Sequence, residues 1–270
     1  MSQPGFTGPV VGQYFGIFKV DTQKFRDVLD AAPFDKTNLL LIAFVHTYKR
    51  GADYVADYEN IRDGGKPPQK GDDDAARIDR LVHTARKMNP NIKIVLSLGW
   101  GKDDIANAAK TPVPFTASVK QLVEKHRLDG FDLDYEDAAV ESSDLLNLVQ
   151  KLRKALGSGK TMTLTPAQTE GLTAETLKIF DWVMPQTYDH GGNGTKADWY
   201  AKTLGGYSKI VLGLNSEGPK GMSDDPVKFA SLAKKKSAAG LFAWRLDTDT
   251  EVQGRPTFVT AIKMWQLMKG

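Results

Sequence analysis

Cysteine is absent from the 270 residues of this sequence. This absence excludes disulfides, thiolate metal sites and a cysteine nucleophile, and it leaves the redox compartment open because a chain without thiols does not respond to redox potential. Long apolar runs are also missing: the longest, residues 39–45, is far shorter than the roughly 20 residues of a membrane span. Residues 1–5 lack the basic and apolar segments of a signal peptide. We therefore expect a soluble chain with no membrane partner.

An excess of charge of one sign is likewise absent. Lysine and arginine number 36 and aspartate and glutamate 33, which gives a net charge of +3, and the two signs are interspersed along the chain. No segment is built for phosphate, so we expect no nucleic-acid partner. The composition, 41% hydrophobic and 26% charged, is typical of a globular chain with a sizeable core, which excludes wholesale disorder and fibrous structure.

The sequence does contain a regular alternation of short apolar runs and amphipathic segments. Eight runs are predicted as strands: residues 10–16, 39–46, 93–101, 128–136, 161–168, 181–189, 209–216 and 240–246. Helical segments follow most of them, including residues 73–88, 115–127, 142–156 and 256–268. Nearly continuous apolar strands are typical of parallel sheets covered by helices. We therefore predict one α/β domain over residues 1–270, a single (β/α)8 TIM barrel, with a doubly wound open sheet as the alternative.

One predicted strand, residues 128–136, is unusually acidic. Side chains alternate faces along a strand, so Asp132, Asp134 and Glu136 point to one face and the apolar residues between them point to the other. Acids on the outer face would lie against the helix layer, where unpaired charges cost several kcal/mol each. We therefore predict that the three acids face the barrel interior and rise to its C-terminal mouth, where TIM barrels carry their active sites.

These three carboxylates do not all ionise together, because like charges at about 7 Å spacing raise each other's pKa. A carboxylic acid that keeps its proton near neutral pH can donate it to a leaving oxygen, and glycosidic-bond cleavage is the reaction class that most needs such an acid. On this segment alone, a solvated acidic edge strand and a divalent-metal site remain alternatives. Elsewhere the four histidines show no paired metal spacing, and no nucleophile elbow or full dinucleotide fingerprint is present.

The spacing of the acids is specific. The pattern Asp129-x-x-Asp132-x-Asp134-x-Glu136 matches in full the signature of glycoside hydrolase family 18, the chitinases and endo-β-N-acetylglucosaminidases. Further segments resemble elements of that family in chain order: Gln13-Tyr14-Phe15, Ala43-Phe44, Ser97-Leu98-Gly99-Trp100-Gly101, Met184-Pro185-Gln186-Thr187-Tyr188-Asp189 and Ala243-Trp244. One departure is Trp100, which stands where the family has a second glycine. The resemblance runs from about residue 10 to residue 244.

The resemblance implies a retaining hydrolysis in which the 2-acetamido group of the substrate is the nucleophile. Glu136 would act as general acid and then base, Asp134 would hold the acetamido N–H, and Asp132 would share a proton with Asp134. Tyr188 would hydrogen-bond the acetamido oxygen, and Trp244 would lie beneath the sugar. The other expected substrate contacts are Tyr14, Phe44, Trp100, Met184, Gln186 and Asp189, with barrel-core filling as the alternative for Phe44 and Met184. No metal and no organic cofactor is implied.

The implied partner is chitin or an oligosaccharide containing N-acetylglucosamine, acted on by a monomer, and the family suggests secretion. Two alternatives remain: an endo-β-N-acetylglucosaminidase on N-glycan cores, which uses the same acids, and a non-catalytic chitinase-like lectin. Tyr188-Asp189 and Trp244 favour chitin, and the presence of all three acids disfavours the lectin. Larger members carry an α+β insertion domain after the seventh strand, whereas residues 216–225 form only a short loop here. The short loop predicts an open groove and endo-acting cleavage.

Overall fold

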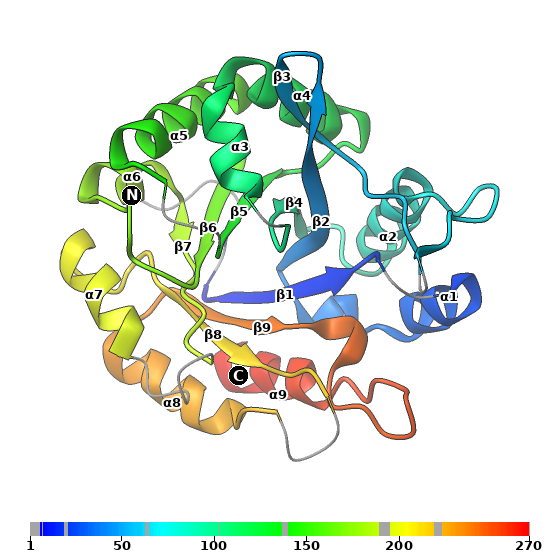
Figure 1. The fold of residues 1–270 in the computed structure, drawn as a ribbon. Helices are drawn as coiled ribbons and strands as arrows, with labels where there is room; N and C mark the ends of the chain where they lie inside the picture. The colour runs from blue at the N-terminus through cyan, green and yellow to red at the C-terminus, as the bar shows by residue number, and fades with distance from the viewer. Residues whose placement is uncertain are drawn as a thin grey trace.

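The computed structural model describes residues 6, 8–18, 21–62, 65–101, 103–136, 140–188, 195–218 and 223–269. Its centre is a barrel of parallel strands, seen along the axis in Figure 1. The barrel strands are β1 (Val10–Gly16), β2 (Leu39–Arg50), β4 (Lys93–Leu98), β5 (Gly130–Tyr135), β6 (Thr161–Pro166), β7 (Trp182–Val183), β8 (Val211–Asn215) and β9 (Gly240–Trp244).

Closure of the sheet distinguishes the predicted barrel from the open alternative. The strands pair in the order β7-β6-β5-β4-β2-β1-β9-β8, so β7 and β8 are the two ends of the sheet. A parallel bridge joins Val183 to Ile210, and the Gly213 N–H donates to the Pro185 carbonyl at 3.2 Å. The two ends therefore meet, and the prediction of a single (β/α)8 barrel is confirmed.

Helices form a ring around the barrel (Figure 1). They are α1 (Thr22–Ala31), α2 (Asp74–Met88), α3 (Asp104–Lys110), α4 (Pro112–Lys125), α5 (Ser142–Leu156), α6 (Ala174–Ile179), α7 (Thr195–Leu204), α8 (Pro226–Lys236) and α9 (Val259–Lys269), with 3-10 turns at Phe34–Lys36 and Leu246–Thr248. Acidic N-caps begin several of them; the Asp73 side chain, for example, accepts the Ala76 N–H at 2.8 Å. Within the described part of the chain, none of these helices is long and apolar enough to cross a membrane.

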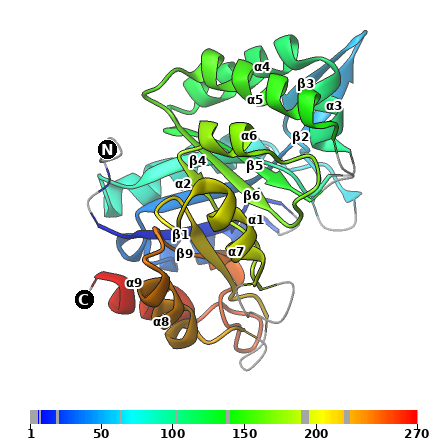
Figure 2. The same cartoon turned by 90° about the vertical axis from the view of Figure 1, so that its left-hand side faces the viewer.

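The largest departure from the predicted elements is a hairpin at the end of β2. The prediction ended this strand at residue 46, where its apolar run stops, but the strand continues to Arg50. It then turns at Gly51, whose φ is 64°, and pairs antiparallel with β3 (Asp53–Asp57). Figure 2 shows the hairpin projecting beyond the ring of helices. The hairpin was not predicted because its side chains are more polar than those of the barrel strands.

Two apolar layers set the direction of the side chains on β5. Phe131, Leu133 and Tyr135 are buried in the layer between the strands and the helices. Asp132 and Asp134 alternate with them, are also buried, and point into the barrel. The predicted register of the acidic strand is therefore the observed one.

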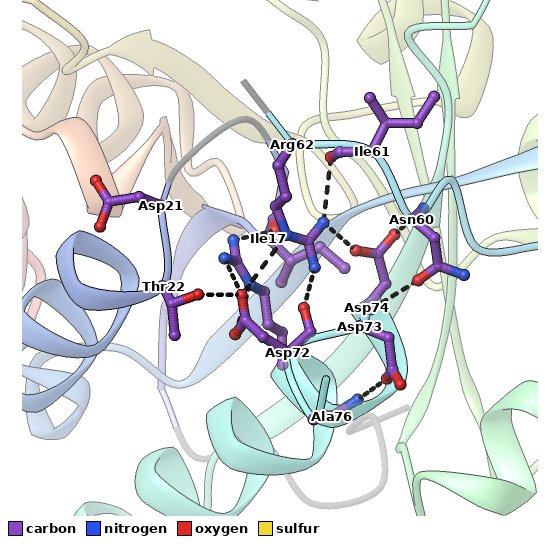
Figure 3. Close-up of polar contacts among 12 residues, drawn as sticks. Ile17, Asp21, Thr22, Asn60, Ile61, Arg62, Asp72, Asp73, Asp74 and Ala76 are labelled. Carbon is purple, nitrogen blue, oxygen red and sulfur yellow. Dashed lines mark hydrogen bonds and ion pairs between the residues drawn. The ribbon is translucent and has the colours of Figure 1, made fainter. Parts of the chain in front are cut away.

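A buried ionic cluster holds the segment between β3 and α2 against the end of β1 (Figure 3). Asp72 accepts the Arg77 Nη2 at 2.5 Å, and the Arg77 Nη1 donates to the Ile17 carbonyl at 2.9 Å. Arg62 donates to the Asp74 carboxylate at 2.6 Å. Since all four charged side chains are nearly inaccessible to solvent, removing one partner would leave a buried charge unpaired. The cluster fixes a loop that borders the C-terminal mouth of the barrel.

Candidate active site

A cavity of about 370 Å³ opens at the C-terminal ends of the barrel strands. It is lined by Tyr14, Phe44, Trp100, Asp134, Glu136, Gln186, Tyr188, Asn215, Glu217, Trp244 and Arg245. The lining residues come from segments spread over more than two hundred positions of the chain. They meet because parallel strands of a closed barrel all end at the same mouth.

Asp132 lies below this cavity and is fully buried. Four hydroxyl groups surround its carboxylate: Ser97 at 2.6 Å, Tyr14 at 2.8 Å, Thr163 at 2.5 Å and Thr165 at 3.1 Å. Burial raises the pKa of Asp132 despite these hydrogen bonds, which act in the opposite direction. The prediction that one acid of the strand holds a proton more tightly than usual agrees with this shift, but the largest cause is desolvation rather than the neighbouring charges.

The raised pKa of Asp132 has a consequence for stability that can be measured. A folded state that binds a proton more tightly than the unfolded state loses stability as the pH rises from the ordinary aspartate pKa of about 4 through the raised value. An Asp132→Asn variant has no such proton to lose. We therefore expect the free energy of unfolding of the parent, relative to this variant, to fall as the pH rises above about 4.

Chemical denaturation of both proteins at several pH values measures this difference. Asp30→Asn is the matched control for the loss of one aspartate, because Asp30 is exposed on α1. A parent that gains stability over Asp132→Asn as the pH rises would contradict the raised pKa.

Gln186 connects the two acids nearest the cavity. Its amide nitrogen donates to the Asp134 Oδ1 at 2.9 Å and also to the Glu136 Oε1. Gln186 itself is buried and follows β7, which is separated from the acid-bearing β5 by one strand, β6. One amide group therefore fixes the positions of the two carboxylates relative to each other in the cavity wall.

Gly99 is required by the close approach of β4 to these acids. A Cβ atom at this position would lie 2.5 Å from the Asp134 Cβ, closer than real Cβ contacts come. The next residue, Trp100, has a φ of 58°, in the left-handed region that favours glycine. This conformation explains why a glycine is expected there. Trp100 adopts the same backbone conformation, and its indole, which is 51% exposed, lies at the cavity edge.

Aromatic rings build another side of the cavity. The Trp244 ring stacks on Phe44 with 5.7 Å between centroids, and it meets Tyr14 edge-on at 5.3 Å. Tyr188 lies across the cavity and contacts Phe242 of the barrel interior. The aromatic faces and the acids together form a site with both an apolar platform and proton-transfer groups.

Three lining residues were not predicted from the sequence: Asn215, Glu217 and Arg245. Glu217 accepts the Trp244 Nε1–H at 2.9 Å, and the Arg245 guanidinium lies 3.4 Å from its other oxygen. Arg245 is held in turn by Asp247. Their polar side chains at or next to the C-terminal ends of two predicted strands were the available signal, because those ends lie at the barrel mouth.

Of the predicted contact residues that the structure describes, Met184 is not in the cavity wall. Met184 is fully buried among apolar side chains inside the barrel, below the cavity, so its alternative role as core filling is the one that the structure shows. Asp189 lies outside the described residues. Over the part of the chain that is described, no group of three or more acidic, histidine or cysteine side chains is arranged to hold a metal ion.

Comparison with known proteins places this site in a family. The family model of the glycosyl hydrolases family 18 matches residues 10–225. Chitinase A1 of Niallia circulans is 28% identical over 146 residues, which cover 44% of this chain and only 21% of that protein.

Solved structures resemble the whole chain. A chitinase from Bacteroides thetaiotaomicron superimposes with a TM-score of 0.75 at 17% identity, covering 97% of both chains. The chitinase-like agglutinin RobpsCRA from Robinia pseudoacacia gives 0.69 at 15% identity, covering 95% of this chain and 99% of that one. At these identities the likeness concerns the fold alone, whereas the family model matches most of the sequence. The chain therefore belongs to glycosyl hydrolases family 18.

Proposed function

We propose that this protein is an endo-acting chitinase, which cleaves β-1,4-linked N-acetylglucosamine polymers with retention of configuration. The observation that carries the proposal is the line of three acids along β5 and the residue that follows it, with the Gln186 amide joining Asp134 to Glu136 in the wall of an aromatic-lined cavity. An acid beside an apolar sugar platform supplies the two things that glycoside cleavage needs, a proton for the leaving oxygen and a fixed ring position.

In this proposal Glu136 protonates the glycosidic oxygen and then activates water. The 2-acetamido carbonyl of the bound sugar attacks C1 and forms an oxazolinium ion. Asp134 holds the acetamido N–H and stabilises the positive charge, and Asp132 shares a proton with it from below. Tyr188 keeps the acetamido oxygen in line, while Trp244 and Phe44 support the sugar from beneath. Secretion, which the family resemblance suggests, and a monomeric state are part of the same proposal.

Product analysis on two substrates tests the function directly. Incubation with N-acetylglucosamine oligomers should give shorter oligomers, and a high-mannose glycopeptide should remain intact. Cleavage of the glycopeptide alone would show the alternative endo-β-N-acetylglucosaminidase. Binding of the oligomers with no product from either substrate would show a non-catalytic lectin.

Fully deacetylated chitosan should resist hydrolysis, because it lacks the group that serves as nucleophile. We expect the rate of reducing-end release from it to be at least about a hundredfold lower than from the acetylated polymer, since an oriented internal nucleophile contributes several orders of magnitude. A thiazoline analogue of the oxazolinium ion should inhibit. Equal rates on the two polymers would remove the substrate-assisted mechanism.

An open groove should make cleavage internal rather than end-directed. Ten residues, 216–225, separate β8 from α8, which is too few for an insertion domain that could form a wall. The viscosity of a soluble chitin derivative should therefore fall early, before many reducing ends appear. Steady release of dimers while the viscosity is preserved would contradict this expectation.

A further inference from the structure

A second cavity of about 390 Å³ lies next to the first, on the other side of Trp100. Its lining residues are His46, Thr47, Tyr48, Glu59, Trp100, Gly101 and Asp104. They come from the part of β2 that extends beyond the barrel, the segment after β3, the segment after β4 and the start of α3. Because the exposed Trp100 indole borders both cavities, a polymer that leaves the first cavity on this side enters the second.

The walls of this second cavity are fixed before any ligand binds. Asp104 accepts hydrogen bonds from the Thr47 N–H at 2.7 Å and the Thr47 hydroxyl at 2.8 Å, and it lies 2.8 Å from the His46 Nδ1. Gly101 is needed beside this pair, because a Cβ there would lie 2.2 Å from an Asp104 oxygen. These contacts hold the side chains of β2 and α3 that form this side of the cavity in place.

The opposite wall, which carries Glu59, is held on both flanks. The Tyr58 hydroxyl lies 2.6 Å from the Nε2 of the buried His126. Asn60 exchanges two hydrogen bonds with Asp74, at 2.8 and 2.9 Å, within the ionic cluster of Figure 3. Glu59 is therefore presented from an anchored segment.

Two polar groups in this cavity are left without a protein partner. Among the described residues, neither the Glu59 carboxylate nor the Tyr48 hydroxyl has a hydrogen-bond or ion-pair partner. The charge there is negative: burial and then the Glu59 and Asp104 carboxylates raise the pKa of Tyr48 to about 12. His46 is the one described basic side chain in the lining, and its Nδ1 already contacts Asp104. Lys102 follows Gly101 in the sequence and lies outside the described residues.

We propose that the second cavity binds a glucosamine unit, whose free ammonium pairs with Glu59 while its sugar ring packs on Trp100. The inference rests on the proposed function and narrows the substrate to partially deacetylated chitin, with an acetylated unit at the cleaved bond and a deacetylated unit beyond Trp100. An acetylated unit in this cavity would displace water from the Glu59 carboxylate and would bring no positive charge to pair with it. An ammonium replaces that water with a charge-assisted hydrogen bond.

Binding to a catalytically inactive background tests the proposal without requiring turnover. In Glu136→Gln protein, calorimetry would compare a partially deacetylated hexamer with the fully acetylated hexamer. Adding Glu59→Gln should weaken binding of the deacetylated hexamer about five- to tenfold more than binding of the acetylated one, the size of one charge-assisted hydrogen bond. Glu175→Gln, which removes an equal charge from exposed α6, is the matched control and should change neither affinity.

The salt dependence of binding is a second measurement, and it requires no substitution in the second cavity. Raising the salt from about 20 mM to about 0.5 M should reduce the preference of the inactive protein for the deacetylated hexamer, because the ammonium pairing is screened. The proposal would be overturned if Glu59→Gln weakened binding of both hexamers equally. It would also be overturned if the preference for the deacetylated hexamer changed neither with salt nor with Glu59→Gln.

Product sequencing separates this inference from the proposed function. The active protein should cut partially deacetylated chitosan so that glucosamine is enriched at one fixed distance from the new chain end, and Glu59→Gln should remove that enrichment. A random glucosamine distribution around cleaved bonds would refute the second cavity while leaving the chitinase intact. Selective binding of the deacetylated hexamer without any hydrolysis would contradict the proposed chitinase activity and still support glucosamine binding in the second cavity.

Discussion

Replacing Glu136 with glutamine should abolish hydrolysis while leaving oligosaccharide binding nearly intact. The amide has the shape of the acid but no proton of suitable acidity, so the loss is that of general acid catalysis, about a hundred- to ten-thousandfold in kcat. The Glu136 Oε1 accepts from Gln186 in the parent, and the glutamine side-chain oxygen can accept the same hydrogen bond. The cavity should therefore keep its form, and KM should change little.

Initial rates and calorimetric binding of an acetylated hexamer measure the two parts of this prediction. Glu175→Gln serves again as the control for a lost carboxylate at a remote surface position, and it should match the parent in both measurements. Turnover of Glu136→Gln within tenfold of the parent would show that another group donates the proton.

The barrel and the direction of its acids were predictable because both depend on local periodicity. Apolar runs mark strands whose two faces are covered, and the parity of residues 131–136 alone decides which face carries charge. The observed burial of Asp132 inside the barrel and of Leu133 outside it follows that parity.

The hairpin and the second cavity were not predictable in the same way. β3 owes its existence to pairing with β2, and its Asp-Tyr-Val-Ala-Asp sequence has too few apolar residues to mark a strand alone. The cavity beside Trp100 needs that hairpin, α3 and the anchored segment at Glu59 to be in place together. Its form depends on contacts between residues about 55 positions apart, such as that of His46 with Asp104.

Within the candidate site, sequence reasoning found most of the lining residues but not the hydrogen bonds between them. Gln186 was expected to contact the substrate; it lines the cavity, and the sequence did not indicate that its amide would also join Asp134 to Glu136. Glu217 gave no signal beyond its position after a strand, yet it hydrogen-bonds the Trp244 indole. Side-chain pairs of this kind depend on rotamers and strand stagger, which hydrophobic patterns do not encode.

Asp134→Ala should lower kcat by about a hundred- to a thousandfold, the usual effect of removing one group that stabilises charge in the transition state. Asp134 is nearly buried, lies against Gly99 and accepts from Gln186, so its carboxylate has one defined position. In the proposed mechanism that position holds the acetamido N–H and faces the positive charge of the oxazolinium ion. Alanine removes both interactions, whereas the sugar platform of Trp244 and Phe44 remains.

The comparison of Asp134→Ala with Asp134→Asn separates orientation from charge. Asparagine retains the volume and an oxygen that can accept from Gln186, but it is neutral. If the charge of Asp134 stabilises the oxazolinium ion, both variants should lose kcat to a similar extent with KM nearly unchanged, because the interaction is made in the transition state rather than in the bound substrate. Steady-state kinetics on an acetylated hexamer measures the two parameters. Near-parental kcat in Asp134→Asn would assign Asp134 to orientation alone, and near-parental kcat in Asp134→Ala would exclude it from the mechanism.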